Sequence, residues 1–462
     1  MEEFGTICAL ATPAGESAIS VVRVSGVDAI EIVDRLFLNP KGERVLLAAK
    51  THTAHYGKIV FDGKIIDECI CTIFKAPHSY TGENSVEISL HGSTYIQNQT
   101  IQALIKSGAK IANPGEYTKR AFLNGKLDLS QAEAVADIIH SHNSAAHELA
   151  FKQLRGGYHQ TLSRLRLNLL DIASLLELEL DFSEEDVEFA DRTHLKNSLN
   201  EIKTIVSELV NSFSLGNAFK NGVPVSIIGK PNAGKSTLLN VLLNEERAIV
   251  SDIAGTTRDT IEESVNIGGV EFRFIDTAGI RASEDIIETE GIKRTYKSVN
   301  NSKIILYLID IANTTPEGAK KEILELKKNV DLNDKHLIIL INKSDTIDVD
   351  KETYDYLQDL EPIFISAKKN INIDEVSKKM LSIANPADII NKVLLTNSRH
   401  YESMIRVLES IESVENGFVQ NMPSDLIAID IRTALYHIGT ITGEVTTDEI
   451  LGNIFSRFCV GK

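Results

Sequence analysis

The sequence has few cysteines, no long apolar run, and no excess of basic residues. Its four cysteines, Cys8, Cys69, Cys71 and Cys459, include no CxxC pair, which argues against a zinc knuckle and a disulfide framework. The acidic start, MEEFGTICALATPAG, lacks an apolar stretch of signal-peptide length. No run approaches the roughly 20 apolar residues that cross a bilayer. These absences predict a soluble, cytoplasmic protein with reduced thiols.

The charge balance is acidic, with 48 Lys and Arg against 65 Asp and Glu and a net charge of −17. A polyanion such as RNA is repelled overall, so any nucleic-acid contact must use a local basic face or a partner protein. Hydrophobic residues make up 43% and charged residues 24%, which excludes a disordered, collagen-like or coiled-coil chain. A length of 462 residues predicts about three domains.

The N-terminal part of the chain, residues 1–124, is typical of an α+β domain. SAISVVRVSG (17–26) and SVEISLHG (85–92) alternate apolar and polar residues like half-buried strands. Residues 52–75 predict a hairpin that turns at Asp62-Gly63.

Helical patterns dominate residues 125–220 and 386–462. Capping-box patterns run from Ser130 to Glu133 and from Thr446 to Glu449. The order of these sequence patterns along the chain predicts a nucleotide-binding domain inserted into one split helical domain. Three independent domains are the alternative.

Between the two helical segments, residues 221–385 alternate short apolar strands with helices. This alternation is typical of a doubly wound, mostly parallel sheet. The predicted strands are 225–229, 271–276, 303–310, 336–342 and 363–366.

GKPNAGKS at residues 229–236 matches the phosphate-binding motif GxxxxGK[ST] in full. It follows a predicted strand and opens a predicted helix, so its glycines can turn backbone amides inward around phosphate oxygens. Lys235 is expected to neutralise the β- and γ-phosphates, and Ser236 to ligate Mg²⁺.

Two switch-like motifs follow in the order expected of a GTPase. GTTRD (255–259) can offer the hydroxyl of Thr257 to Mg²⁺ as a second ligand. DTAG (276–279) ends a strand, where Asp276 suits an outer-shell Mg²⁺ role and the amide of Gly279 can sense the γ-phosphate.

Two base-recognition motifs complete the series. In NKSD (342–345), the carboxylate of Asp345 can accept hydrogen bonds from the guanine N1 and exocyclic amine, which adenine cannot supply. SAK (366–368) completes the base pocket. Five motifs in order, each at a strand end, predict GTP binding.

Hydrolysis requires an aligned water, yet the usual glutamine after DTAG is replaced by Ile280. Isoleucine cannot orient water, so another residue must. Three acidic residues of RASEDIIETEGIKR are candidates, and spacing alone does not choose between Glu284, Glu288 and Glu290. The ordinary alternative for Glu288, nine residues past Gly279, is a solvated glutamate on a helix face.

Over essentially its whole length the chain resembles the MnmE (also called TrmE) family of tRNA uridine-5-carboxymethylaminomethyl modification GTPases. The resemblance rests on ATPAGESAISVVRVSG, PHSYTGENSVEISLHG, NPGEYTKRAFLNGKLDLSQAEAVADII, GKPNAGKST, IAGTTRD, DTAGIR and the terminal FCVGK. It implies an N-terminal tetrahydrofolate-binding domain (1–124), a helical domain split into 125–220 and 386–462, and an inserted Ras-like P-loop GTPase domain (221–385).

The resemblance also implies an activity. A GTP hydrolase of this family works with the flavoprotein MnmG to add a carboxymethylaminomethyl or aminomethyl group at C5 of the wobble uridine of certain tRNAs. The one-carbon unit is attributed to a methylene-tetrahydrofolate, with a 5,10-methylene or 5-formyl derivative as the bound folate. Family members form homodimers through the N-terminal domain and a heterotetramer with MnmG. Their G domains dimerise across the switch faces when K⁺ sits beside the phosphates.

Site residues follow from the motifs and the resemblance together. The predicted GTP-binding residues are Asn232, Ala233, Gly234, Lys235, Ser236, Thr237, Ser251, Asp252, Ile253, Ala254, Gly255, Thr256, Thr257, Asp276, Thr277, Ala278, Gly279, Asn342, Lys343, Asp345, Ser366, Ala367 and Lys368. The Mg²⁺ ligands are Ser236 and Thr257. The resemblance implies K⁺ ligands at Asn232, Ser251, Ile253 and Thr256, and folate contacts at Arg23, Glu87, Lys126 and Lys462. It implies catalytic roles for Glu288, which would orient the attacking water, and for Cys459. Lys235 of the phosphate-binding motif is the third predicted catalytic residue.

Two positions depart from the family pattern. Ser251 stands where the family commonly has threonine, but serine keeps a hydroxyl oxygen for K⁺. Val460 replaces the usual isoleucine of the terminal motif, a conservative change. In that motif Cys459 would ordinarily be a buried structural cysteine, whereas the resemblance implies a functional thiol near the folate and tRNA site.

Two other clusters of polar residues are expected to have no catalytic or metal-binding role. His140 and His142 are two apart on a predicted helix and are expected to be structural or surface residues. The acidic run at 181–186 is expected to be a solvated loop, not a metal site. A different class of function, a regulatory GTPase acting as an assembly switch in ribosome biogenesis, is the alternative, but such a switch needs no folate pocket.

Overall fold

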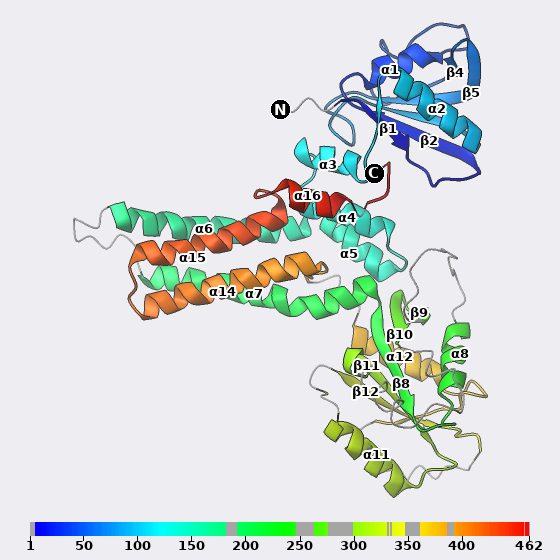
Figure 1. The fold of residues 1–462 in the computed structure, drawn as a ribbon. Coiled ribbons are helices and arrows are strands. Elements are labelled where there is room, and N and C mark those ends of the chain that lie inside the picture. Colours follow the sequence, from blue (N-terminus) through cyan, green and yellow to red (C-terminus); the bar gives the residue numbers. More distant parts are fainter. Residues whose placement is uncertain are drawn as a thin grey trace. The chain divides into compact units, whose positions relative to one another are not determined.

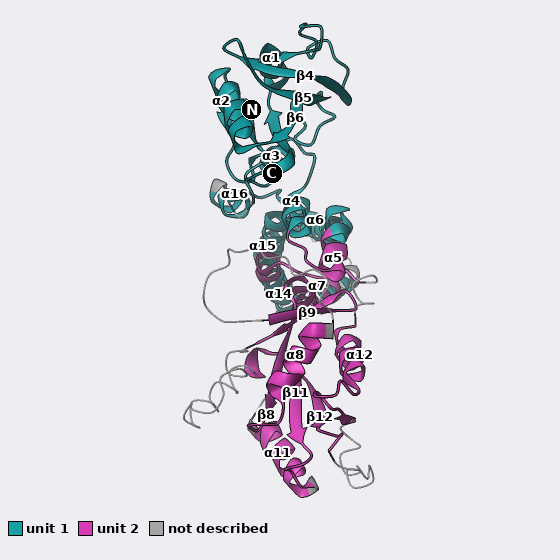
Figure 2. Ribbon diagram, turned by 90° about the vertical axis from the view of Figure 1, so that its right-hand side faces the viewer, with its two compact units in different colours: residues 1–139, 151–203, 403–462 teal, residues 140–150, 204–402 magenta. Residues whose placement is uncertain are grey.

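The chain forms two units, which Figure 2 shows in different colours. Unit 1 contains residues 1–139, 151–203 and 403–462, and unit 2 contains residues 140–150 and 204–402. The computed structural model describes residues 5–181, 192–245, 263–275, 299–329, 332, 335–346, 361–385, 392–456 and 458–461. Three helices pass from one unit to the other: α5 (Ser144–Leu154), α7 (Arg192–Asn221) and α14 (Ser398–Val419).

The N-terminal part of unit 1 is built on a seven-stranded sheet in the order β3-β4-β5-β6-β2-β1-β7 (Figure 1). The strands are β1 (Ile7–Leu10), β2 (Ser17–Ser25), β3 (Phe37–Leu38), β4 (Thr53–Phe61), β5 (Lys64–Phe74), β6 (Ser85–Gly92) and β7 (Lys110–Ile111). Neighbouring strands are antiparallel except β1 and β7, which are parallel. Asp62 and Gly63 join β4 to β5 with φ of 48° and 73°, which confirms the predicted hairpin.

The two faces of this sheet differ because side chains alternate along each strand. Val22 and Val24 of β2 are fully buried in a cluster that includes residues of helices α1 (Ala29–Leu36) and α2 (Thr94–Lys106). Arg23 lies between them and points to the opposite face. The sheet therefore presents one packed face and one face that can carry polar chemistry.

Helices complete unit 1: α3 (Glu116–Leu123), α4 (Leu129–Ile139), α6 (Gly157–Asp181), α15 (Ser424–Thr442) and α16 (Asp448–Phe455), with parts of α5, α7 and α14. Helices α6 and α15 lie side by side (Figure 1). Arg432 of α15 donates to Glu177 of α6 at 2.6 Å. The two residues are 255 positions apart in sequence. The helical part thus contains chain segments from before and after the second sheet in sequence, as the sequence predicts.

The cap of α4 differs from the sequence-based expectation. Asp128 accepts from the backbone amide of Gln131 at 2.8 Å, while the Gln131 side chain accepts from the amide of Asp128 at 3.0 Å. This reciprocal pair is a capping box two residues ahead of the predicted one from Ser130 to Glu133, which is wrong. Ser130 lies inside the helix and its hydroxyl donates to Asp128 at 2.6 Å.

The cap of α16 is also shifted. Thr447 accepts from the amide of Ile450 at 3.2 Å, so the predicted cap at Thr446, paired with Glu449, is wrong by one residue. The capping-box pattern favours Thr446, because Glu449 stands three residues after it whereas Ile450 stands three residues after Thr447. The structure starts the helix one residue later, so Thr447 caps it without a reciprocal glutamate.

Unit 2 is built on a six-stranded sheet in the order β13-β12-β11-β8-β10-β9. The strands are β8 (Val223–Gly229), β9 (Glu263–Ile267), β10 (Val270–Phe274), β11 (Ile304–Asp310), β12 (His336–Asn342) and β13 (Ile363–Phe364). Neighbours are parallel except in the β9–β10 hairpin at the edge. The five predicted strands are all present, and β9 is an additional strand that the sequence analysis missed.

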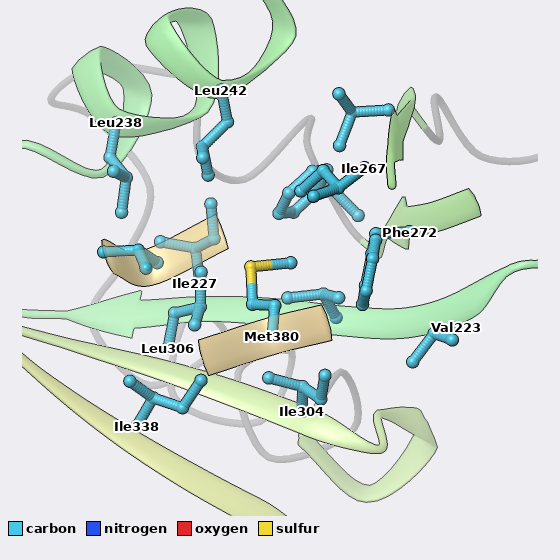
Figure 3. Packing of buried hydrophobic residues seen from close by; sticks show 14 of the residues in the cluster. Val223, Ile227, Leu238, Leu242, Ile267, Phe272, Ile304, Leu306, Ile338 and Met380 are labelled. Carbon is cyan, nitrogen blue, oxygen red and sulfur yellow. The ribbon is translucent and has the colours of Figure 1, made fainter. Parts of the chain in front are cut away.

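Helices cover both faces of this sheet, which confirms the doubly wound arrangement. Helices α8 (Lys235–Glu245) and α12 (Ile373–Ala384) contribute to the apolar cluster on one face, and α11 (Pro316–Asn329) to the cluster on the other. Figure 3 shows Leu238 of α8 and Met380 of α12 meeting the side chains of the strands. The core therefore holds the carboxyl ends of the parallel strands, and the loops after them, in place.

Within the described ranges of the chain, no helix combines the length and the apolar character that a membrane span requires.

The cap of α4 generates a first prediction. Replacing Asp128 with alanine should lower the free energy needed to open the first turn of α4 by about 1–2 kcal/mol, because the amide of Gln131 loses its acceptor. Amide hydrogen exchange at residues 129–132 measures this opening. Ser130→Ala is the matched control, since it removes a hydroxyl but leaves the capping carboxylate, and it should have less than half the effect. Equal protection in wild type and Asp128→Ala would contradict the assignment.

Candidate functional site

The loop between β8 and α8 contains the predicted phosphate-binding motif. Its backbone has positive φ at Asn232 (63°) and Gly234 (99°). A Cβ on Gly234 would lie 2.3 Å from the side-chain nitrogen of Asn342, so only glycine fits where these two motifs touch. Asparagine adopts such a conformation more readily than most residues. The loop ends at the N-terminus of α8, where free backbone amides suit a phosphate.

Lys235 is the first residue of α8, and its ammonium turns back over the loop. It donates to the carbonyl oxygens of Gly229 at 2.9 Å and Lys230 at 2.8 Å. Burial lowers the pKa of Lys235. The side chain is thus held inside the loop where phosphate oxygens are expected, next to Ser236 in the first helical turn.

The same loop is anchored to α11 by an ion pair. Lys230 approaches Glu322 at 2.5 Å, and the hydroxyl of Tyr307 donates to the other oxygen of Glu322 at 3.0 Å. The Glu322 side chain is only 15% exposed, so this contact is better shielded from solvent than an ordinary surface pair. The ion pair restrains the start of the loop at Lys230, whereas the other end of the loop continues into α8.

Asn342 joins three motifs at the carboxyl edge of the sheet. Its side-chain nitrogen donates to the carbonyl of Ala233 at 2.7 Å, and its side-chain oxygen accepts from the amide of Ala367 at 3.0 Å. Asn342 is 2% exposed. The structure therefore brings the phosphate loop, NKSD and SAK together, at the edge where open α/β sheets bind ligands.

Asp345 lies beside the SAK motif. Ser366 donates to its carboxylate at 2.7 Å, and Lys369 approaches the other oxygen at 3.4 Å. The hydrogen bond from Ser366, followed by the interaction with Lys369, lowers the pKa of Asp345. The carboxylate is therefore charged at neutral pH and suited to accept hydrogen bonds. Lys368, in contrast, is exposed.

Several predicted residues lie outside the described residues. These are Ser251, Asp252, Ile253, Ala254, Gly255, Thr256, Thr257, Asp276, Thr277, Ala278, Gly279, Glu288 and Lys462, together with the alternatives Glu284 and Glu290 and positions 182–186 of the acidic run. Their roles stay predictions.

A second group of predicted residues gathers on the N-terminal sheet. Arg23 of β2 and Glu87 of β6 stand directly opposite each other in the antiparallel register. Two nitrogens of the guanidinium donate to the same Glu87 oxygen, at 2.9 Å and 3.1 Å. Among the described residues no hydrogen bond reaches the other oxygen of Glu87, and the side chain is 32% exposed. A carboxylate in this state fits the amino and N–H edge of a pterin ring.

The terminal motif reaches this group. The carbonyl of Gly461 accepts from Arg23 at 3.4 Å, and the carbonyl of Cys459 accepts from the amide of Gly115 at 3.4 Å. Gly461 has φ of 97°, and a Cβ there would lie 2.2 Å from the carbonyl oxygen of Leu10. The end of the chain is thus fitted against β1 and β2.

Cys459 itself is exposed, unlike Cys8, Cys69 and Cys71, which are buried. Its neighbour Phe458 is 7% exposed and packs in an apolar cluster with residues of α4 and α16. A structural cysteine would be buried like the other three, so the interpretation of Cys459 as core packing is wrong.

Lys126 connects to the same region through the loop at residues 77–82. Its ammonium donates to the carbonyl of Pro77 at 3.1 Å. In this loop the ring of Tyr80 lies 5.6 Å from the Arg23 guanidinium, and its hydroxyl shares a 2.8 Å hydrogen bond with Thr118. Burial raises the pKa of Tyr80.

Sequence reasoning missed the aromatic partners of Arg23. Tyr117 is fully buried, lies 5.6 Å from the guanidinium, and donates from its hydroxyl to the carbonyl of Arg23 at 2.8 Å. Both Tyr80 and Tyr117 stand inside family-specific motifs, PHSYTGEN and NPGEYTKR, so the signal was present. A tyrosine in a motif does not reveal which charged residue it supports.

The oxygen atoms of the phosphate loop suit the expected cations. Ser236 and Asn232 offer hydroxyl and amide oxygens, which hard cations such as Mg²⁺ and K⁺ prefer. The described part of the chain contains no group of three or more His, Cys, Asp or Glu residues that could hold a metal. His140 and His142 are exposed in the connection between α4 and α5 and not on a helix, in agreement with a surface role.

Comparisons with known proteins match the chain over its whole length. Residues 129–459 match the family model of the MnmE helical domain, and residues 6–126 match the model of the GTP-binding protein TrmE N-terminus. The tRNA modification GTPase MnmE of Flavobacterium johnsoniae is 51% identical over 465 residues, with 99% of each chain covered. Those of Flavobacterium psychrophilum and Bacteroides fragilis are 50% identical, again with 99% coverage of each chain.

The chain is also similar to solved structures. The G domain of the T. maritima FeoB iron transporter is 23% identical, with a TM-score of 0.26, and covers 35% of this chain and 99% of that chain. A likeness of this size supports no conclusion about function.

The geometry around Asp345 generates a second prediction. Asp345→Asn reverses the hydrogen-bonding pattern that faces the base edge, so GTP binding should weaken on the order of 100-fold and preference should move toward xanthosine triphosphate. Titration with fluorescent GDP and XDP analogues measures both affinities. Asp374→Asn on α12 is the control, because that carboxylate forms an exposed ion pair with Lys378 on its own helix. An Asp345→Asn variant with the wild-type affinity for GDP would contradict the assignment.

Proposed function

The chain belongs to the MnmE family of tRNA modification GTPases, and we propose that it binds and hydrolyses GTP as part of the modification of tRNA. The observation that supports this most directly is the hydrogen-bonded union of the phosphate loop, NKSD and SAK through Asn342. The relatives at about 50% identity carry the name tRNA modification GTPase. Sequence, local geometry and relatives thus point to the same chemistry.

The proposed nucleotide chemistry assigns one task to each described residue. The loop amides and Lys235 bind the phosphates, and the carboxylate of Asp345 selects guanine. Ser236, together with Thr257, would hold Mg²⁺, which neutralises charge on the phosphates when it is bound. Glu288 would orient the attacking water, since Ile280 cannot.

We further propose that the loop residue Asn232 contributes to a K⁺ site with Ser251, Ile253 and Thr256. Its left-handed backbone, with φ of 63°, places an amide side chain in the phosphate loop. Since the motifs contain no obvious arginine finger, a cation here would supply positive charge beside the phosphates. In this proposal the G domains of two chains dimerise across their switch faces to complete the site.

The N-terminal site is proposed to bind a tetrahydrofolate derivative, either 5,10-methylene- or 5-formyl-tetrahydrofolate. Glu87 would pair with the pterin edge, while Arg23, Lys126 and Lys462 would interact with the folate carboxylates or orient the ring. The bound folate would supply a one-carbon unit. The exposed thiol of Cys459 would act nearby, and this proximity is supported by the contact between Arg23 and Gly461.

The remaining parts of the proposal concern assembly and domains. We propose a cytoplasmic homodimer through residues 1–124 that joins the flavoprotein MnmG in a heterotetramer and acts at C5 of the wobble uridine. The product would carry a carboxymethylaminomethyl or aminomethyl group. Residues 125–220 and 386–462 would form the split helical domain around the G domain at 221–385. The match of residues 6–126 to the TrmE N-terminus model favours this over an assembly switch.

The decisive experiment is mass spectrometry of wobble-uridine nucleosides from cells that lack this protein. Loss of the modified nucleoside, its restoration by the wild-type chain, and no restoration by Asp345→Asn are expected. Unchanged nucleosides in the deletion strain would overturn the proposal and favour the assembly switch.

Cation dependence is the third prediction. GTP turnover should be at least about tenfold faster in K⁺ than in Na⁺ at equal ionic strength, because the smaller ion fits the proposed oxygen cage less well. Asn232→Ala should abolish this preference while it leaves GDP affinity within about threefold. Steady-state phosphate release in the two salts is the measurement, and equal wild-type rates would contradict the K⁺ site.

The exposed thiol gives the fourth prediction. Cys459→Ser should keep the melting temperature and the GTPase rate but abolish wobble-uridine modification, because a hydroxyl lacks the nucleophilicity of a thiolate. Cys69→Ser is the control: it places a hydroxyl in a buried site, so stability should fall. Nucleoside analysis and melting of both variants separate the roles. Full modification by Cys459→Ser would remove this residue from the site.

A further inference from the structure

Asp310 is a buried carboxylate at the nucleotide edge of the sheet in unit 2, and no sequence motif singled it out. It is the last residue of β11, and its register partner on the parallel strand β12 is Asn342. Its side chain is 8% exposed. A carboxylate in such a place needs several donors, and the residues that supply them indicate what it holds.

Three donors converge on Asp310. The ammonium of Lys343 donates at 2.6 Å, the side chain of Asn313 at 2.7 Å, and the backbone amide of Ala312 at 3.0 Å. Burial acts to raise the pKa of Asp310, but the hydrogen bonds from these donors outweigh it, so the pKa is lowered. The group is a charged anchor, and its strongest partner belongs to the NKSD motif.

Lys343 needs such an anchor because of its position. It has a left-handed backbone, with φ of 66°, which lysine rarely adopts. In the sequence it stands between Asn342, whose side chain is bonded to the phosphate loop, and Asp345, the residue proposed to recognise guanine. Its side chain is 33% exposed, so one part is covered while another faces solvent or a ligand.

A lysine whose ammonium is fixed leaves its four methylene groups as a rigid apolar strip. The ammonium of Lys343 is bound at Asp310, and Lys343 stands two residues before Asp345 in the sequence. We propose that Asp310 is a positioning residue for guanine nucleotides, which acts by holding the Lys343 stem against the flat face of the base. The inference rests on the proposed GTP site and assigns to it a residue outside the five motifs.

The proposal separates two parts of base recognition. Asp345 reads the hydrogen-bonding edge, whereas Asp310, through Lys343, would support the ring face. A face contact does not distinguish the exocyclic amine of guanine from its absence in hypoxanthine. Loss of Asp310 should therefore weaken binding of GDP and IDP by the same factor, while Asp345→Asn should change the choice of base.

The test compares Asp310→Asn, Lys343→Met and the double variant in the full-length protein, with GDP and IDP as ligands in calorimetry. Asp310→Asn should weaken both about tenfold, and the kcat at saturating GTP should stay within twofold of wild type. In the Lys343→Met background, Asp310→Asn should change affinity by less than twofold, because the residue acts through the lysine. Asp374→Asn is the control for loss of a carboxylate in the same unit and should have no effect.

Each other outcome contradicts the proposal. Wild-type GDP affinity in Asp310→Asn, or losses that add in the double variant, would show that Asp310 does not act through Lys343. A fall in the nucleotide-free melting temperature with a parallel loss of kcat would make Asp310 a purely structural residue. Failure of the wild-type protein to bind GDP would instead overturn the proposed function itself, so the two failures are distinguishable.

Discussion

The buried amide of Asn342 is the interaction on which the nucleotide site depends. A primary amide has two donors and two acceptor positions, and leaving one buried group unpaired costs roughly 1–3 kcal/mol. Here the partners are the backbone of Ala233 and Ala367, which belong to two different loops. Neither loop can move away without leaving a polar group of Asn342 unsatisfied. The close approach of Gly234 to the same side chain adds a steric limit to this restraint. A single side chain therefore couples the phosphate-binding and base-binding ends of the site.

The N-terminal site is held together differently. Its polar side chains come from opposite positions on two strands, and its boundary comes from the far end of the chain, where backbone carbonyls of the terminal motif accept hydrogen bonds from Arg23 and Gly115. Phe458 anchors that end in an apolar cluster, which leaves the next residue, Cys459, at the surface. Aromatic rings of Tyr80 and Tyr117 lie near the guanidinium and limit where it can go. An arginine restrained in this way is prepared for an anionic or flat ligand.

Much of the fold was predictable because the patterns that specify it are local. The hairpin at Asp62-Gly63 and five of the six strands of the second sheet follow from turn chemistry and short apolar runs. The predictions that were wrong also concern short segments of the chain. The cap of α4 was placed at Ser130 because a serine followed by a glutamate fits the pattern, whereas Asp128 and Gln131 fit it equally well. Strand β9 was missed because an edge strand pairs on one side only and has a weaker apolar signature.

The sequence by itself determined the class of protein and predicted the chemistry of its motifs, since the pattern of a phosphate loop or of a base-recognition motif lies in residue types and spacing within a few positions. Tertiary structure alone decided which distant residues meet. The ion pair of Lys343 with Asp310 and the contact of Arg23 with Gly461 join residues whose separation in sequence gives no hint of proximity. The exposure of Cys459 likewise follows from where the chain end packs. The physical reason is that these contacts depend on the order of strands in a sheet and on the path of the chain end. Both are settled by packing the whole core and not by any local preference.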